Sequence, residues 1–285
     1  MLPGLSPFKA ALLLGAAFLF GIYGCATSDS FANLGEMAVW ASERGFSIRD
    51  IEAGSFRLAA FVRERSAGGG TMVVYIEGDG APWPTPYHPP RDPTPNKPVS
   101  LALAAADPSP VVVYLGRPCQ YLDAAALRRC DSRYWIERRF APEVIAAYDV
   151  AVTQLKSSFR ARRLRLVGYS GGGVIAVLLA AIRDDVDSLV TVAAPLALSE
   201  WVALHDASPL TGSLDPAGLG DDIRLPPSVH FVGASDRTVP APVIERFIRR
   251  KGGRMETVPD FDHDCCWVRD WANLLARVPV KENAK

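Results

Sequence analysis

Short apolar runs rich in β-branched residues alternate with segments of helical periodicity along most of the chain. The runs that predict strands span residues 55–62, 71–77, 111–115, 164–168, 188–193, 228–233 and 253–259. Most of these runs are apolar at nearly every position, which is the pattern of strands buried on both faces of a parallel sheet. We therefore expect a sheet with helices packed against both of its sides.

The segments between these strands carry helical patterns. One predicted helix begins at Pro142, where proline suits the first helical turn, and others span residues 172–182, 241–250 and 267–277. This alternation predicts an α/β fold, with an open, mostly parallel central sheet flanked by helices. Ligands of such sheets bind beyond the carboxyl ends of the strands, so the residues that directly follow each strand are candidates for function.

One strand-to-helix junction carries the pattern G-x-S-x-G. The strand RLRLVG leads into Gly168-Tyr169-Ser170-Gly171-Gly172, and the apolar helix GGVIAVLLAAI leads out of it. The glycines let neighbouring backbone come close, and the turn places the serine hydroxyl at a helix N-terminus, where negative charge is favoured. Ser170 is therefore the candidate nucleophile. The alternative is a glycine-rich turn with an N-capping serine.

A serine nucleophile needs a base that takes its proton and a carboxylate that orients the base. His263 follows the last predicted strand in a polar loop and is the candidate base, whereas His230 lies within a strand, which favours a packed side chain. Asp236 follows the strand HFVG and is the candidate acid. Asp262 and Asp264 are poorer alternatives, because immediate neighbours of the histidine in an extended loop tend to point away from it.

Acyl transfer also requires two donors for the oxyanion that develops on the substrate. We expect one from the N–H of Gly171, which follows the candidate nucleophile, and the other from the E-G-D-G loop after the second strand, with the Asp79 N–H as candidate. A proline-dense loop follows at residues 82–98. It either walls the substrate pocket, with Trp83 and Tyr87 as apolar surface, or only covers the sheet.

The N-terminal residues have the features of an export signal. Lys9 precedes an apolar run that is shorter than the roughly 20 residues of a membrane span, and small residues lead to Cys25. The segment I-Y-G-C resembles the lipobox of bacterial lipoproteins, with Tyr23 where that motif has a small residue. The resemblance implies a lipid-anchored Cys25, and Ala26 after it implies the outer membrane, facing the periplasm. The alternatives are an ordinary secretory signal and an uncleaved anchor.

Export places the other cysteines in an oxidising compartment, where disulfides form. Cys119, Cys130, Cys265 and Cys266 make an even set. A bond between Cys119 and Cys130 closes a short loop and is the preferred pairing. Cys265 and Cys266 either bond to each other or remain buried thiols. No Cys/His spacing matches a zinc-site template, so we expect no metal.

Length and composition indicate how many domains the chain has and which classes of partner it can bind. The chain has 285 residues, 49% of them hydrophobic, and 31 Lys plus Arg balance 31 Asp plus Glu, so its formal net charge is zero. This length suits one α/β domain, which we place at 46–280, after a signal at 1–24 and a tether at 25–45. Balanced charge gives no basis for binding nucleic acid. The oligomeric state stays open.

The turn around Ser170, the acid Asp236 after a strand and His263 near the C-terminus resemble, in this order, the α/β-hydrolase superfamily over residues 46–277. The segments YLGRPCQY and HDCCW are similar to a branch of exported bacterial hydrolases. The resemblance implies a Ser-His-Asp esterase with a small cap or none, a small ester or acyl substrate, and no metal or organic cofactor. An acyltransferase with the same triad and a non-catalytic envelope binding lipoprotein are the alternatives.

Overall fold

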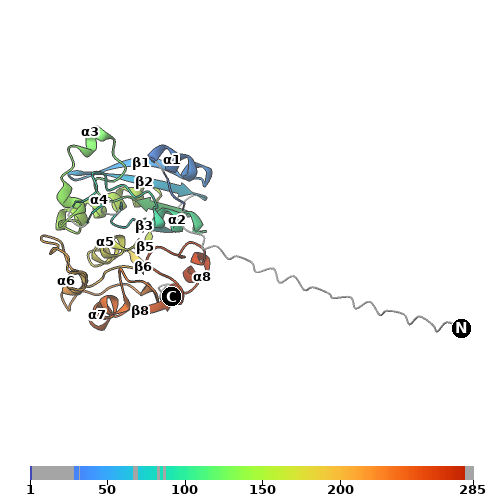
Figure 1. The fold of residues 1–285 in the computed structure, drawn as a ribbon. Coiled ribbons are helices and arrows are strands. Elements are labelled where there is room, and N and C mark those ends of the chain that lie inside the picture. Colours follow the sequence, from blue (N-terminus) through green and yellow to red (C-terminus); the bar gives the residue numbers. More distant parts are fainter. Residues whose placement is uncertain (2–28, 32, 67–69, 82–83, 86–87, 280–285) are drawn as a thin grey trace.

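A single sheet organises the part of the chain that the computed structural model describes, residues 1, 29–31, 33–66, 70–81, 84–85 and 88–279. Eight strands of these residues form it in the order β1-β2-β4-β3-β5-β6-β7-β8 (Figure 1). They are β1 Ser47–Ala53, β2 Phe56–Glu64, β3 Thr71–Ile76, β4 Val111–Leu115, β5 Arg163–Tyr169, β6 Val186–Val192, β7 Ser228–Gly233 and β8 Arg254–Val258. The β1–β2 and β2–β4 pairs are antiparallel and all other neighbours are parallel, so the predicted mostly parallel sheet is confirmed.

Helices cover both faces of this sheet (Figure 1). They are α1 Leu34–Glu43, α2 Val99–Ala106, α3 Ala124–Leu127, α4 Pro142–Ser158, α5 Gly171–Ala180, α6 Leu198–Leu204, α7 Ala241–Lys251 and α8 Trp271–Leu275, with 3₁₀ turns η1 Ser132–Trp135 and η2 Pro216–Gly218. Along β3, Val74 and Ile76 join the core with α4, α5 and α7, while Val73 and Tyr75 join the core with α1, α2 and α8. Burial on both faces explains why this strand is an unbroken apolar run.

Helix α1 lies inside residues 25–45, for which the sequence predicts a tether. Its Met37 and Ala41 are buried in the core, and the Asn33 side chain caps the first turn by accepting the N–H of Glu36. The folded body therefore begins before residue 46.

Helix α8 is shorter than the predicted helix at 267–277. Trp267 is fully buried, and its indole N–H donates to the carbonyl oxygen of His263 at 2.9 Å. This contact holds the residues before Trp271 against the preceding loop, and they form turns in place of the first helical turn.

The four cysteines of the folded body form two disulfides. Cys119 and Cys130, with Cα atoms 5.8 Å apart, are joined on either side of α3, which is the pairing preferred from the sequence. Cys265 and Cys266 bond to each other, which is one of the two states left open for them. Both bonds lie beyond the carboxyl ends of strands, the first after β4 and the second after β8.

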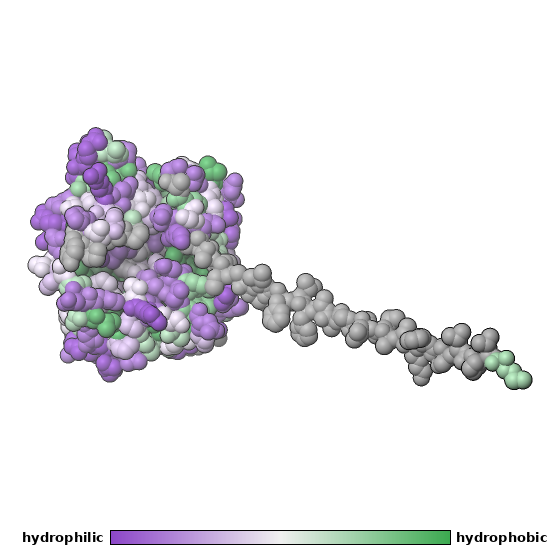
Figure 2. Space-filling view, viewed as in Figure 1, coloured by the Kyte–Doolittle hydropathy of each residue, from purple (hydrophilic) through white to green (hydrophobic). Residues whose placement is uncertain are grey.

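The face of the molecule in Figure 2 is mostly hydrophilic, with its apolar residues gathered in small patches instead of one broad band. No helix within the described residues combines the length and the apolar character that crossing a membrane requires. Residues 2–28, which hold most of the predicted signal and Cys25, lie outside the described residues.

Candidate active site

Ser170 stands in a tight turn between β5 and α5, with φ 48° and ψ −125°. A side chain at Gly168 would place its Cβ 2.3 Å from the carbonyl oxygen of Gly172, and a Cβ at Gly172 would lie 2.2 Å from the carbonyl oxygen of Ile76. Neither position tolerates a side chain, which explains the glycines of the pattern. The positive φ of Ser170 is strained for a residue with a Cβ, and it turns the hydroxyl away from the sheet.

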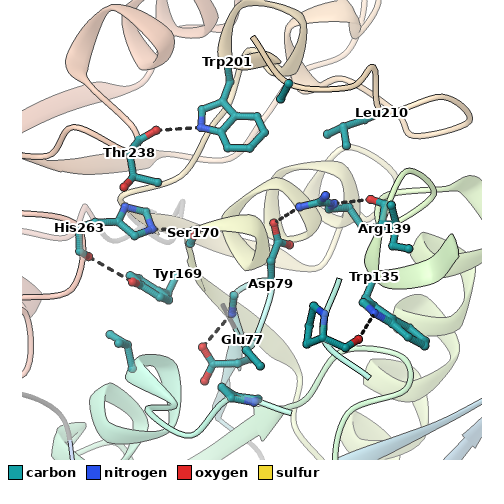
Figure 3. Close-up of a pocket in the computed structure, with 18 of the residues that line it drawn as sticks. Glu77, Asp79, Trp135, Arg139, Tyr169, Ser170, Trp201, Leu210, Thr238 and His263 are labelled. Carbon is teal, nitrogen blue, oxygen red and sulfur yellow. Dashed lines mark hydrogen bonds and ion pairs between the residues drawn. The ribbon is translucent and has the colours of Figure 1, made fainter. Parts of the chain in front are cut away.

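The structure brings the three predicted triad residues together. His263 Nε2 lies 3.1 Å from Ser170 Oγ, and His263 Nδ1 lies 3.0 Å from Asp236 Oδ2 (Figure 3). A carboxylate only accepts hydrogen bonds, so Nδ1 carries the proton and Nε2 is left to accept from the serine. The Asp236 side chain is fully buried and His263 is 18% exposed. Asp236 Oδ1 accepts the backbone N–H groups of Thr238 and Val239 at 2.8 and 2.7 Å, which fixes the carboxylate.

The loop that carries His263 is fastened by its neighbours. The Tyr169 hydroxyl, from the residue before the nucleophile, donates to Asp264 Oδ1 at 2.8 Å and lies 3.2 Å from the carbonyl oxygen of His263. Asp262 Oδ1 accepts the N–H groups of Asp264 and Cys265. Both alternative acids therefore use their carboxylates to hold the loop, and the imidazole faces Asp236.

The remaining histidines have other partners. His230 is buried between Thr191 and Ser228, at 2.9 and 3.1 Å, and burial lowers its pKa to about 3, so the prediction of a packed side chain is confirmed. His88 bonds to the Thr85 hydroxyl at the surface. His205 ends α6, and its Nε2 lies 2.8 Å from the carbonyl oxygen of Thr238.

The loop after β3 passes close to the nucleophile. A Cβ at Gly78 would lie 3.4 Å from Ser170 Cβ. The N–H of Asp79 has no hydrogen-bond acceptor among the described residues. Gly171 is the first residue of α5, and N–H groups of a first helical turn have no partner within the helix. Among the described residues, neither of the two predicted oxyanion donors has an acceptor for its N–H.

A buried carboxyl group supports this loop from beneath. Glu77 is 1% exposed, and its Oε1 accepts the Gly78 N–H at 2.8 Å. Burial raises the pKa of Glu77 to about 7, although the Gly78 N–H favours the ionised form. Near neutral pH, this side chain is therefore divided between acid and carboxylate.

A cavity of about 920 Å³ opens over Ser170 and His263. Trp201 of α6 and Trp135 of η1 line it, and Figure 3 shows them on different sides of the serine. Each indole N–H donates to a backbone carbonyl, at 2.8 Å for Trp201 and 3.1 Å for Trp135, so the ring planes are fixed. The cavity therefore offers two preorganised aromatic surfaces beside the candidate nucleophile.

These two tryptophans were missed from the sequence. Trp83 and Tyr87, the expected apolar walls, lie outside the described residues. Trp135 and Trp201 come from segments without any motif, and only the packing of loops from distant strands brings them to the cavity. The short cap formed by α6 and residues 205–210 contributes one side of the lining.

Solved structures that share this arrangement of strands and helices include serine hydrolases and esterases. The fold is that of the α/β-hydrolases. A Xanthomonas campestris serine hydrolase described as having no lid superposes with a TM-score of 0.55 at 14% identity, covering 81% of this chain and 91% of that chain. A Pyrococcus furiosus esterase gives 0.56 at 14% identity, covering 88% and 97%. A serine hydrolase homologue from Coxiella burnetii gives 0.53 at 16% identity, covering 81% and 96%. No protein-family model and no curated protein matches the sequence.

Proposed function

We propose that the chain is a serine hydrolase that cleaves a carboxylic ester through Ser170, His263 and Asp236. The observation that carries the proposal is the unbroken chain of hydrogen bonds from Asp236 through His263 to Ser170, at 3.0 and 3.1 Å. Ser170, where this series of hydrogen bonds ends, lines a cavity of a size that suits an organic ester. The similar folds of a serine hydrolase and of an esterase support the same class of reaction.

The proposed reaction has two steps, acylation of Ser170 and hydrolysis of the acyl-enzyme, and the same groups act in both. Ser170 Oγ bonds to the acyl carbon while its proton passes to His263 Nε2, and the carbonyl oxygen becomes an oxyanion beside the N–H groups of Gly171 and Asp79. The C–O bond to the alcohol then breaks, and His263 returns the proton to the leaving oxygen. Water attacks the acyl-enzyme in the same way and releases the acid and Ser170. Asp236 holds the imidazole and stabilises its protonated form.

A fluorophosphonate probe tests the nucleophile directly. We expect the protein to be labelled, and Ser170→Ala to abolish both labelling and ester hydrolysis while keeping the thermal melting curve, because the change removes one hydroxyl at a partly exposed turn. Ser158→Ala, at the exposed end of α4, is the matched control and should react as wild type. Undiminished turnover by Ser170→Ala would reject the assignment.

A panel of p-nitrophenyl esters of increasing acyl length then measures the size of the acyl group. Adding a small alcohol to the same assay separates hydrolysis from acyl transfer, since a transferase yields a new ester while a hydrolase yields the free acid. An envelope binding protein on the same fold would neither react with the probe nor turn over any ester of the panel.

We also propose that Cys25 anchors the protein to the outer membrane through lipid, with the catalytic domain in the periplasm. The predicted export signal and the segment that resembles a lipobox support this proposal. Stable anchoring takes two acyl chains or more, since one chain binds only marginally. Mass spectrometry of the mature N-terminus decides it. An unmodified terminus at another residue would mean an ordinary secreted protein, and Cys25→Ser should release the protein from membranes while esterase activity persists.

A further inference from the structure

Two arginines form ion pairs with the carboxylate of Asp79, whose N–H is the proposed second oxyanion donor. Asp79 Oδ1 accepts from Arg117 Nη1 at 2.9 Å, and Asp79 Oδ2 accepts from Arg139 Nη1 at 2.6 Å. The arginine side chains are 3% and 11% exposed, whereas 34% of the Asp79 side chain is exposed. Figure 3 shows the Asp79 carboxylate between Ser170 and Arg139. The cluster therefore belongs to the wall of the cavity and stands beside the reacting groups.

Backbone contacts fix the two guanidinium groups. Arg117 Nη2 donates to the carbonyl oxygen of Arg139 at 2.7 Å, and Arg139 Nε donates to the carbonyl oxygen of Ile136 at 2.5 Å. The Arg117 guanidinium also stacks 5.1 Å from the centre of the Phe140 ring. These bonds tie the loops that follow β3, β4 and η1 into one unit, with Asp79 at its centre.

The Asp79 carboxylate lies close enough to the nucleophile for its charge to affect the proposed oxyanion. A Cβ at Gly171 would lie 2.1 Å from Asp79 Oδ1, so the carboxylate rests directly on the residue that follows Ser170. Burial alone would raise the pKa of Asp79, but Arg139 and Arg117 outweigh burial and hold the pKa below its usual value, so the group is ionised. An unneutralised negative charge at this place would oppose the oxyanion of the proposed reaction.

We propose that Arg139 and Arg117 are positioning residues that act through Asp79. They neutralise its carboxylate, leave the cluster with a formal charge of +1, and hold the loop so that the Asp79 N–H serves the oxyanion. This inference rests on the proposed serine hydrolase function. Gly171 is part of the arrangement, because any side chain there would push the carboxylate away from the arginines.

The first experiment replaces Arg139, which is the more exposed arginine. We expect Arg139→Gln to lower kcat per probe-labelled active site by about tenfold or more, a fraction of the loss on removing an oxyanion donor, with little change in KM. Arg139→Lys keeps the charge and should restore part of the rate. Arg138→Gln is the matched control, since Arg138 pairs with Glu143 outside the cavity lining and should react as wild type.

The second experiment measures the affinity of the site for a stable mimic of the oxyanion intermediate. Phenylboronic acid forms a bond from Ser170 Oγ to boron, the serine proton passes to His263, and the boron becomes a tetrahedral anion that resembles the oxyanion intermediate. Its affinity should fall in Arg139→Gln by about as much as kcat, while KM for a neutral ester stays nearly constant. A purely structural role would instead lower the fraction of labelled sites and leave the affinity of the remaining sites unchanged.

A double-mutant cycle with Asp79→Asn tests whether Arg139 acts through the carboxylate. Once the carboxylate is absent, there is no negative charge left to neutralise, so Arg139→Gln should have much less effect in the Asp79→Asn background. The inference would be overturned if the two substitutions lowered kcat by independent factors that multiply in the double mutant. An unchanged affinity of Arg139→Gln for phenylboronic acid would overturn it as well. In either case, an active wild type would leave the proposed function standing. A wild-type protein without labelling or turnover would overturn both.

Discussion

Replacing Asp236 by asparagine changes the tautomer of His263, and the structure shows why. Asp236 Oδ1 accepts two backbone N–H groups, from Thr238 and Val239. The amide of asparagine has one oxygen, which must take that side, because an NH₂ group cannot accept hydrogen bonds. The NH₂ group then faces His263 Nδ1 and donates to it. Nδ1 must be unprotonated, so Nε2 carries the proton and points at the Ser170 hydroxyl.

An imidazole in this tautomer has no lone pair to offer Ser170. We therefore expect Asp236→Asn to lower kcat about 10⁴-fold, as in the best-studied triad, which corresponds to about 5.5 kcal/mol of transition-state stabilisation. KM should change little, because the fully buried Asp236 side chain does not line the cavity. Initial rates with p-nitrophenyl butyrate measure both constants, and a thermal melt checks the fold.

The matched control for this substitution is Asp262→Asn. It makes the same chemical change at a carboxylate that accepts only backbone N–H groups of the histidine loop, so its effect on kcat should be far smaller. A near wild-type rate in Asp236→Asn, together with an inactive Asp262→Asn or Asp264→Asn, would show that the acid has been assigned to the wrong residue.

Three further predictions concern stability. Because the native pKa of Glu77, about 7, exceeds its ordinary value of 4.5, wild-type stability falls as pH rises from 5 to 7 and levels off above 7. Glutamine does not titrate, so the unfolding free energy of Glu77→Gln should gain roughly 2.5 kcal/mol on that of wild type between pH 5 and 8 in urea titrations. A pH-independent difference would contradict this. Gly172→Ala puts a Cβ 2.2 Å from a carbonyl oxygen of β3 and should cost about 1–3 kcal/mol or more, whereas Gly70→Ala, with nothing within 4 Å, should be neutral. Removing both Cys119 and Cys130 should lower the unfolding free energy by about 2–3 kcal/mol, and an unchanged thermal melt would argue against a bond between them.

The meeting of Ser170, His263 and Asp236 was predictable because each position depends on a short stretch of sequence. A strand that ends in G-x-S-x-G fixes Ser170 by the space its glycines leave, and Asp236 and His263 directly follow other strands of the same sheet. Parallel strands bring such positions to one edge, so topology alone predicts that they meet. Strands β3 to β7 were predictable for a different reason, since burial on both faces makes each of them mostly apolar.

Features that depend on distant packing were not predictable. Helix α2 is buried from Val99 to Ala104, so it shows no periodicity that would mark a helix. The Arg117–Asp79–Arg139 cluster joins residues 38 and 60 positions apart, and no pattern along the chain relates them. Helix α1 was missed for another reason, since it follows an export-like segment and its few buried positions are sparse among polar residues.

The carbonyl oxygen of Thr238 accepts from Trp201 of the cap helix α6 and from His205, which follows that helix, each at 2.8 Å. Thr238 is two residues from Asp236. Widening the cavity at α6 therefore means breaking two hydrogen bonds to the loop that carries the acid. One backbone oxygen therefore links the position of α6 to the loop that holds Asp236. Under the proposed function, a bulky ester that displaced α6 would also disturb the loop of Asp236, so discrimination by size would appear in kcat as well as in KM.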